Sequence, residues 1–442
     1  MKPRVSPSAR ARALGAYTVA WWLLAPLAVL RLLWRSRRDR AYRAFLGERF
    51  GVYARPAAQG EGPLLWLHAV SLGETRAAAP LIEALRRLVP DLRLLLTHTT
   101  PSGRAAGAEL LQQGDEQAWL AYDLPWAVQR FLRHFRPRLG VLMETELWPN
   151  LARACAGQDV PLLLANARLS ARSAARWARW PALAEATCGA LAGAAAQTGG
   201  DASRLRELGV RDVVVAGNLK FDRRGDAALR ALGRGWRDAA GRRVLVLAST
   251  RGDRGASEEQ LLLDALPDGL LARVLLVIVP RHQDRVPMLR QMLEQRGLRH
   301  GLRSQAAPDT SVDVWIGDSF GEMPAYYAMA DAAFVGGSLL PLGGQNLIEA
   351  CAEGCPVVMG PHVFNFAQAV EQAEQAGAAR RAADAREVWN ALLHWLDDDA
   401  ALARARAAAR AFSSSHRGAA QAQAHWIAQR LRAAPAAAPR DQ

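Results

Sequence analysis

Short apolar runs alternate with longer segments of helical periodicity through the first half of the chain, and this alternation restricts the fold more than any other feature. The runs are Leu64–Val70, Leu92–Thr99, Ala118–Tyr122, Leu139–Glu144, Pro161–Asn166 and Val213–Gly217. Runs this apolar fit strands that are covered on both faces, as in a parallel sheet. The segments between them, such as Thr75–Leu88, repeat apolar residues at helical spacing. The pattern therefore predicts a doubly wound α/β domain.

A second set of apolar runs follows a polar segment that is punctuated by glycine. These runs are Val244–Ser249, Arg273–Pro280, Val314–Gly317, Ala332–Val335 and Pro356–Met359. We therefore expect an N-terminal α/β domain over residues 46–222, a linker over 223–242 and a C-terminal α/β domain over 243–432. Residues 433–442, rich in Ala and Pro, are expected to form a disordered tail.

The first 45 residues form a basic and apolar segment that predicts a membrane anchor. Ala13–Leu30 carries no charge over 18 residues, the short end of the range for a transmembrane helix. Arginines are denser after this stretch than before it, which would keep the following domains on the cytoplasmic side of the membrane. A cleaved signal peptide and a helix lying in the membrane interface are the alternatives. The basic cluster after the stretch argues against a signal peptide.

The charge balance favours anionic partners. Lys and Arg number 56 against 42 Asp and Glu, a net charge of +14, which suits nucleic acid, acidic lipid or a phosphorylated substrate. The arginines are spread over the predicted helices and the chain has no recognised nucleic-acid motif, so we expect no nucleic-acid partner. It also has no P-loop, no G-x-G-x-x-G and no G-x-S-x-G, which argues against ATP hydrolysis, ordinary NAD use and an α/β-hydrolase.

The cysteines indicate neither a metal site nor a disulfide framework. The four cysteines include no C-x-x-C pair, and Cys351 and Cys355 lie in an apolar stretch without a matching pair of ligands. A structural zinc ion wants four ligands at characteristic spacing. We expect buried, reduced thiols, no metal and no cofactor.

Polar clusters stand where the predicted strands of the first domain end, and ligands of α/β sheets bind at such ends. Glu74 ends "SLGE", Glu144 begins the acidic part of "METELWPN", and Arg168 and Lys220 lie in "NARLSARS" and "GNLKFD". Each cluster alone has an ordinary explanation. Glu74 is also a good helix-start residue, the two acids of "METE" fit a solvated turn, and the other two clusters fit helix caps.

Three further clusters follow strands of the second domain: "VPRH", "GDSFGE" and "FVGGSLLPLGGQNLIEA". Turns dense in glycine expose backbone N–H groups that suit a phosphate, although ordinary turn chemistry explains each turn equally well. Asn346 and Glu349 lie three residues apart, so one helix face could present both to a sugar or a base.

Taken together, these motifs make the chain resemble the 3-deoxy-D-manno-octulosonic acid (Kdo) transferases of lipopolysaccharide core assembly. The matching stretches span roughly residues 35–370 in family order: "HAVSLGE", "TPSGR", "YDLPWAVQRFLRHFRPRLGVLMETELWPN", "NARLSARS", "GNLKFD", "PRH", "GD-x-x-GE", "FVGGSL", "GGQNLIEA" and "MGPHVFNF". The resemblance implies a GT-B glycosyltransferase with two Rossmann-like domains facing a cleft. It implies transfer of Kdo from the donor CMP-Kdo to the lipid A precursor, lipid IVA, at the inner membrane with its anionic lipids.

The resemblance also implies roles for individual residues. Glu74 would be the general base of an inverting displacement, and Glu144 and Lys220 would stabilise the transition state. Arg168 is expected to contact anionic substrate on grounds of charge. The residues expected to bind CMP are Arg281, His282, Phe320, Gly321, Glu322, Asn346, Leu347, Ile348 and Glu349.

Two departures from the family pattern weaken parts of this assignment. An insertion in "ASTRGDRGASEE" leaves the neighbouring Ser249, Thr250 and Arg251 unassigned, and Gln345 stands where many relatives have His. Another GT-B enzyme that acts on a lipid is the nearest alternative, and a membrane-anchored scaffold without catalysis is a more distant one. The N-terminal motifs argue against the first, and the acids and lysine in those motifs argue against the second.

Overall fold

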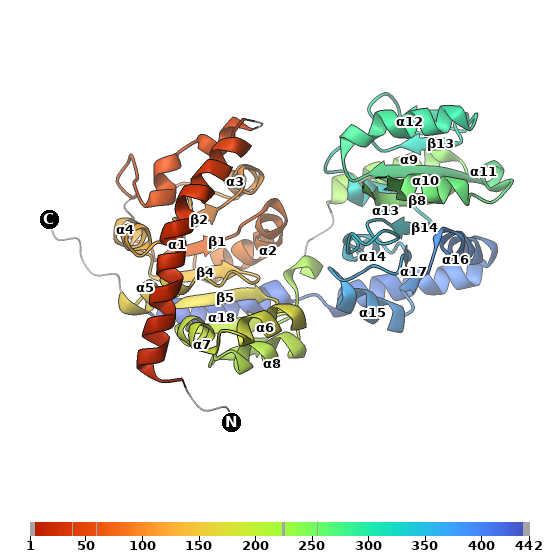
Figure 1. Cartoon of the computed structure of the whole chain (residues 1–442). Helices are drawn as coiled ribbons and strands as arrows, with labels where there is room; N and C mark the ends of the chain where they lie inside the picture. The colour runs from red at the N-terminus through yellow and green to blue at the C-terminus, as the bar shows by residue number, and fades with distance from the viewer. Residues whose placement is uncertain (1–4, 38, 59, 223–225, 254, 436–442) are drawn as a thin grey trace. The chain divides into compact units, whose positions relative to one another are not determined.

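A computed structural model describes residues 5–37, 39–58, 60–222, 226–253 and 255–435. The chain divides into two compact units: Met1–Arg223 with Arg417–Gln442 form unit 1, and Arg224–His416 form unit 2. Each unit is a layered α/β structure around one parallel sheet (Figure 1). The two parallel-sheet domains expected from the sequence, which are those of the GT-B class, are therefore confirmed.

The sheet of unit 1 has seven strands in the order β3-β2-β1-β4-β5-β6-β7, and every pairing is parallel. The strands are β1 Leu64–His68, β2 Arg93–His98, β3 Glu116–Trp119, β4 Leu139–Met143, β5 Leu162–Ala167, β6 Gly193–Ala196 and β7 Val213–Val215. The sequence predicted all of them except β6. Its residues, Gly-Ala-Ala-Ala, lack the branched side chains that mark a strand, but all four are buried.

Helices cover both faces of this sheet, because successive strand residues point to opposite sides. Leu64 and Trp66 of β1 pack with helices α4, α5, α7 and α8, whereas Leu65 and Leu67 pack with α2 and α18. The helices of unit 1 are α1 Pro7–Arg35, α2 Leu72–Leu88, α3 Pro101–Ala108, α4 Pro125–Phe135, α5 Pro149–Gly157, α6 Ala171–Ala178, α7 Pro181–Cys188, α8 Gly199–Glu207 and α18 Ala419–Ala433, with 3₁₀ turns η1 Arg40–Arg43, η2 Leu46–Phe50 and η3 Leu219–Asp222.

Helix α18 belongs to unit 1, although the sequence analysis assigned residues up to 432 to the C-terminal domain. The backbone N–H groups of Gly418 and Ala420 both donate to the Asp222 carboxylate. Trp426 of α18 lies so close to β6 that a Cβ atom on Gly193 would come within 2.9 Å of its ring. This approach explains why a glycine stands at position 193. The expected tail at 433–442 lies mostly outside the described residues.

The sheet of unit 2 also has seven parallel strands, in the order β12-β13-β11-β8-β14-β15-β16. The strands are β8 Arg243–Thr250, β11 Val274–Pro280, β12 His300–Leu302, β13 Val314–Ile316, β14 Ala332–Val335, β15 Val357–Met359 and β16 Ala379–Arg381; β9 Gly252–Asp253 and β10 Ala256–Ser257 form a separate hairpin at the expected insertion. The sequence analysis missed the two edge strands, β12 and β16, which are short and only partly buried.

One face of this sheet packs through Leu245 and Leu247 against α10, α12, α16 and α17. On the other face, Trp236 of α9, Trp315 of β13 and Tyr326 of α13 form an aromatic cluster with ring centroids 5.0 to 5.8 Å apart. The helices of unit 2 are α9 Ala227–Ala240, α10 Glu258–Asp264, α11 Leu270–Arg273, α12 Val286–Gln295, α13 Met323–Met329, α14 Ile348–Ala352, α15 Ala367–Gln375, α16 Ala385–Asp397 and α17 Asp399–Ser415, with the 3₁₀ turn η4 Gln283–Arg285.

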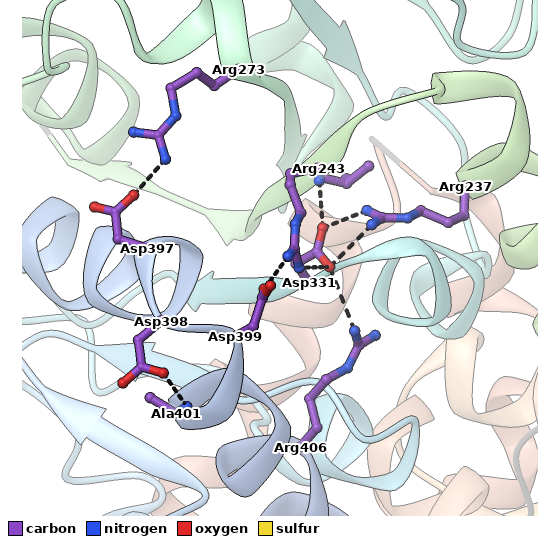
Figure 2. A network of polar contacts seen from close by, with 10 residues as sticks. Arg237, Arg243, Arg273, Asp331, Asp397, Asp398, Asp399, Ala401 and Arg406 are labelled. Atoms are coloured by element: carbon purple, nitrogen blue, oxygen red, sulfur yellow. Dashed lines mark hydrogen bonds and ion pairs between the residues drawn. The ribbon is translucent and has the colours of Figure 1, made fainter.

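Most of the segment expected to be a linker, residues 223–242, is helix α9 of unit 2; residues 223–225 lie outside the described residues. The buried carboxylate of Asp331 binds α9 to the amino edge of the sheet (Figure 2). It pairs with Arg237 of α9, Arg243 of β8 and Arg406 of α17, and accepts the Val244 N–H at 2.8 Å. The sequence pattern looked polar because α9 carries arginines that pair with carboxylates of unit 2: Arg237 with Asp331 and Arg230 with Glu353.

Replacing Asp331 by Ala should destabilise unit 2 by about 3 kcal/mol, because the change leaves three arginines without their shared, buried partner. Asp397→Ala is the matched control. Asp397 pairs with Arg273 at the surface (Figure 2), where both side chains are more than half exposed, so its loss should change stability by less than about 0.5 kcal/mol. Urea unfolding of both variants measures the difference; equal effects would contradict the role given to Asp331.

Candidate active site

The candidate catalytic residues of unit 1 lie at the point where the strand order reverses. Strands β1 and β4 are neighbours, yet the chain continues from β1 toward β2 on one side and from β4 toward β5 on the other. Glu74 follows β1 and Glu144 follows β4, so both acids stand at the carboxyl edge of adjacent strands. This switch point is where open α/β sheets bind their ligands.

Glu74 sits in the first turn of α2 and closes the turn that follows β1. Its carboxylate accepts the Val70 N–H at 2.8 Å and the Ser71 hydroxyl at 3.2 Å, while Ser71 is the N-cap of α2. Neighbouring groups fix the same turn: Thr100 donates to the Val70 carbonyl at 3.1 Å, and the His98 ring bonds the Ala69 carbonyl at 2.9 Å. Glu74 is thus a helix-start residue, as one reading of the sequence had it, with its carboxylate held in one orientation.

The pKa of the Glu74 carboxyl is raised from 4.5 to about 7. Burial is the main cause, because a half-buried carboxylate loses hydration, and the negative charges of Glu144 and Glu146 add to the effect. The bonds from Val70 and Ser71 oppose the shift. A carboxyl with a pKa near neutrality can take up a proton during a reaction and return it to water afterwards.

Glu144 and Lys220 form an ion pair in the same region. Lys220 Nζ lies 3.2 Å from Glu144 Oε1, and both side chains are about three-quarters buried. The backbone of Glu144 has φ of +58°, a left-handed conformation that is uncommon outside glycine. Such strain often marks a site where the direction of a side chain matters. The sequence analysis grouped these two residues, and the structure brings them together.

The position of Lys220 depends on residues that the sequence analysis did not identify. Asn166, buried and also left-handed with φ of +51°, accepts the Leu219 N–H at 3.0 Å. Gln423 of α18 accepts the Asn166 N–H at 2.8 Å and donates to the Gly217 carbonyl at 3.0 Å. The final helix therefore holds the loop that carries Lys220. No local signal in the sequence marks Gln423, since its role depends on the return of α18 to unit 1.

Glu146 is a second residue that sequence reasoning left without a role. Its charge acts on Glu74, and burial raises the pKa of its own carboxyl. Trp148 Nε1 donates to Glu146 at 2.8 Å. Arg168 is half-buried, and its carbonyl accepts the hydroxyl of Thr145, so the Arg168 segment adjoins this acidic turn.

The expected nucleotide-binding residues of unit 2 follow strands β11, β13 and β14, on one edge of the second sheet. Arg281 and His282 are exposed, and Phe320 is 75% exposed. Gly321 has φ of +81°, and Glu322 pairs with Arg303 at 2.9 Å. The loops after the neighbouring strands β11 and β13 thus present an exposed cation and an exposed ring, groups that suit the phosphate and the base of a nucleotide.

The "NLIE" segment divides into residues that face inward and residues that remain accessible. The side chains of Leu347 and Ile348 are buried, so they can reach a ligand through backbone groups only. Asn346 and Glu349 are half-buried, and Asn346 Oδ1 accepts the Ile348 N–H at 3.1 Å, which starts α14.

In the glycine-rich turn after β14, three N–H groups that the sequence pattern had suggested for a phosphate, those of residues 337–339, are already bonded within the protein. The buried carboxylate of Glu258 already accepts them, from Gly337 at 2.6 Å and from Ser338 and Leu339 at 2.9 Å each. It also accepts the Arg251 N–H, from the end of β8, at 2.9 Å. Glu258 therefore joins the loops at the switch point of the second sheet, where β8 and β14 are neighbours.

The part of the chain that the structure describes has no evident metal-binding site. Within the described ranges, no group of three or more His, Cys, Asp or Glu side chains comes close enough to hold an ion. All four cysteines are buried, free thiols. Burial raises the pKa of each thiol, which keeps it protonated and unreactive.

Comparison with known proteins identifies relatives over almost the whole chain. A family model described as "3-Deoxy-D-manno-octulosonic-acid transferase (kdotransferase)" matches residues 45–223. The 3-deoxy-D-manno-octulosonic acid transferase of Bordetella pertussis is 45% identical over 92% of this chain and 96% of its own length. That of Haemophilus influenzae is 34% identical over 79% of this chain and 82% of its own. A solved structure, Anabaena Alr3699/HepE in complex with UDP, covers 84% of this chain and all of its own with a TM-score of 0.55 and 16% identity, a likeness of fold.

The raised pKa of Glu74 makes the stability of unit 1 depend on pH. Between pH 4.5 and about 7 the folded state binds more protons at Glu74 than the unfolded state, so this group lowers the free energy of unfolding as pH rises. Glu74→Gln removes the titration. The difference in free energy of unfolding, variant minus wild type, should therefore increase by on the order of 2 kcal/mol from pH 4 to pH 8. Urea unfolding at the two pH values measures this difference. The exposed Glu83 of the same helix provides the control: Glu83→Gln should show no such trend.

Replacing Glu258 by Gln should loosen the turn after β14, because an amide N–H₂ would then face two of the N–H donors that a carboxylate accepts. Hydrogen exchange of the Gly337, Ser338 and Leu339 amides should accelerate at least tenfold, the equivalent of about 1.4 kcal/mol. Amides of the buried strand β11 serve as the internal reference. Unchanged exchange at all three positions would contradict the anchoring role of Glu258.

Proposed function

Since the chain belongs to the 3-deoxy-D-manno-octulosonic acid (Kdo) transferases of lipopolysaccharide biosynthesis, we propose that it transfers Kdo from CMP-Kdo to the lipid A precursor, lipid IVA, with inversion at the anomeric carbon. The observation that carries the mechanistic part is the Glu74 carboxyl, oriented by Val70 and Ser71, with a pKa of about 7. In this proposal Glu74 is the general base.

In the proposed reaction, different groups handle the proton of the attacking hydroxyl and the negative charge of the leaving CMP. A sugar hydroxyl of lipid IVA attacks the anomeric carbon of Kdo while Glu74 takes the hydroxyl proton. The bond between that carbon and the phosphate oxygen breaks, and CMP leaves with the bonding electrons. Negative charge therefore grows on the phosphate, where positive groups lower the barrier. The Lys220–Glu144 pair is proposed to stabilise this transition state.

Donor binding is proposed for the loops of unit 2. The exposed Arg281 and His282 suit the CMP phosphate and ribose, and the exposed Phe320 suits the face of the cytosine ring. Gly321, Glu322, Asn346 and Glu349 would complete the site with side chains, and Leu347 and Ile348 with backbone groups. Arg168 is proposed to meet an anionic group of either substrate.

The cellular setting forms part of the proposal. Helix α1 would attach the enzyme to the inner membrane, with both units on the cytoplasmic side. Among the described residues it is the one helix long and apolar enough to cross a membrane. Anionic lipids and the phosphates of lipid A would both attract the net charge of +14.

An assay with CMP-Kdo and lipid IVA in detergent tests the role of Glu74. Wild type should release CMP and increase the mass of the lipid, whereas Glu74→Gln, which can keep the two bonds of the turn, should lose at least about 10²-fold in kcat. For wild type, kcat/KM should rise with pH through about 7, because Glu74 must lose its proton to act as a base. Glu83→Gln is the matched control. Equal rates for Glu74→Gln and wild type would contradict the assignment.

A further inference from the structure

The outward face of helix α1 is apolar, which is the reverse of a helix on the surface of a soluble domain. Val19, Leu23, Leu27, Leu30 and Trp34 are spaced three or four residues apart and are 58 to 73% exposed. This spacing puts them on one side of the helix, where they form a continuous apolar stripe. A stripe of this kind marks a surface that another apolar phase covers.

The opposite face of α1 is bonded to unit 1 through polar side chains. Tyr17 donates its hydroxyl to Asp123 at 2.9 Å, and Thr18 donates to Asn150 at 2.9 Å. Asp123 is buried and also accepts the N–H groups of Asn150 and Leu151 in the first turn of α5. Tyr17 therefore completes a network that belongs to the core of unit 1.

Further contacts extend along the helix in both directions. Near its start, Arg10 lies 3.5 Å from Glu185 of α7. At its middle, the Trp21 ring lies 6.0 Å from that of Tyr122 and 6.4 Å from that of Trp148. Figure 1 shows α1 running along the side of unit 1 past α5 and α7, helices that it contacts.

This attachment is incompatible with a helix that crosses a bilayer. The contacts from Arg10 to Trp21 cover about 17 Å of helix at 1.5 Å per residue. Crossing takes about 30 Å of helix surrounded by lipid, so Tyr17 and Thr18, which lie within the apolar segment, would have to leave their partners. The buried carboxylate of Asp123 would then lose the hydrogen bond from Tyr17, and the loss of a hydrogen bond to a buried group is destabilising.

Positive charge follows the apolar stripe. Arginines at the end of α1 and just after it are exposed: Arg31, Arg35, Arg37, Arg40 and Arg43. Each basic residue near an anionic bilayer contributes about 1 kcal/mol of attraction. The exposed Trp22 and Trp34 rings suit the level of the lipid headgroups.

We infer that α1 lies in the plane of an anionic membrane surface, with its apolar stripe in the boundary between headgroups and acyl chains and its other face fixed to unit 1. This inference rests on the proposed membrane attachment and changes its form from a spanning anchor to a surface-bound helix. Trp21 contacts Trp148, whose ring nitrogen bonds Glu146 of the candidate site. The helix that meets the membrane is therefore linked, through Trp21 and Trp148, to the acidic turn of the candidate site.

Labelling of single introduced cysteines separates the two forms. The four native cysteines are buried and give little background. Ser8→Cys reports the exposed start of α1, and Glu83→Cys reports unit 1. The two variants are compared in inverted inner-membrane vesicles, whose cytoplasmic face points outward. A membrane-impermeant maleimide should label the introduced cysteine of each variant without permeabilisation. If Ser8→Cys is labelled only after detergent is added while Glu83→Cys is labelled at once, α1 spans the membrane and the inference is wrong.

Vesicle flotation tests the stripe itself. The full chain should float with vesicles of phosphatidylcholine and phosphatidylglycerol. A double variant that carries both Leu23→Glu and Leu27→Glu should show a bound fraction at least tenfold lower. Leu261→Glu, at an exposed apolar residue of unit 2, is the matched control and should bind like wild type. Undiminished binding of the double variant would overturn the inference. Transfer activity in detergent is a separate readout, so failure here is distinguishable from failure of the proposed reaction.

Discussion

The loss of hydration at the Glu74 carboxyl is the constraint on which the chemistry proposed for unit 1 depends. The same carboxylate closes the turn between β1 and α2, and the negative charges of Glu144 and Glu146 raise its pKa further. A carboxylate that only capped a helix would be more stable if it were exposed, because burial penalises its charged form. The fold tolerates this penalty at the switch point, where a sheet can bring a buried acid to a ligand.

The surrounding residues hold the acid cluster in shape from distant parts of the chain. Lys220 balances Glu144, Asn166 orients the loop of Lys220, and Gln423 in the final helix orients Asn166. The second sheet uses a related solution at its own switch point, where Glu258 occupies the N–H groups of a glycine-rich turn. In both units a carboxylate with little access to water accepts backbone N–H groups and so fixes the loops at the switch point.

The sequence predicted the features whose causes are local. Apolar runs marked β1 and β4, and the residues at their ends marked Glu74 and Glu144, because strand, turn and helix start all leave a signal within a few residues. The roles of α9, α18 and Gln423 could not be predicted in this way, since each depends on a partner far along the chain. Strand β6 was missed because it has no branched or aromatic side chain, and the reason for its glycine, the approach of Trp426 from α18 to Gly193, lies far along the chain. The hydrogen bonds from the turn after β14 to Glu258 could not be predicted either, because the sequence does not show which loops lie close together.

The most direct test of the account is the titration of Glu74 itself. The side-chain carboxyl carbon of glutamate, labelled with ¹³C and assigned by comparison with Glu74→Gln, reports its protonation by NMR. The account predicts a midpoint at about pH 7 in the wild-type protein, and a lower midpoint when Glu146 is replaced by Gln. A midpoint near 4.5, the ordinary value for a glutamate, would mean that Glu74 is a solvated helix-start residue and would contradict the central claim.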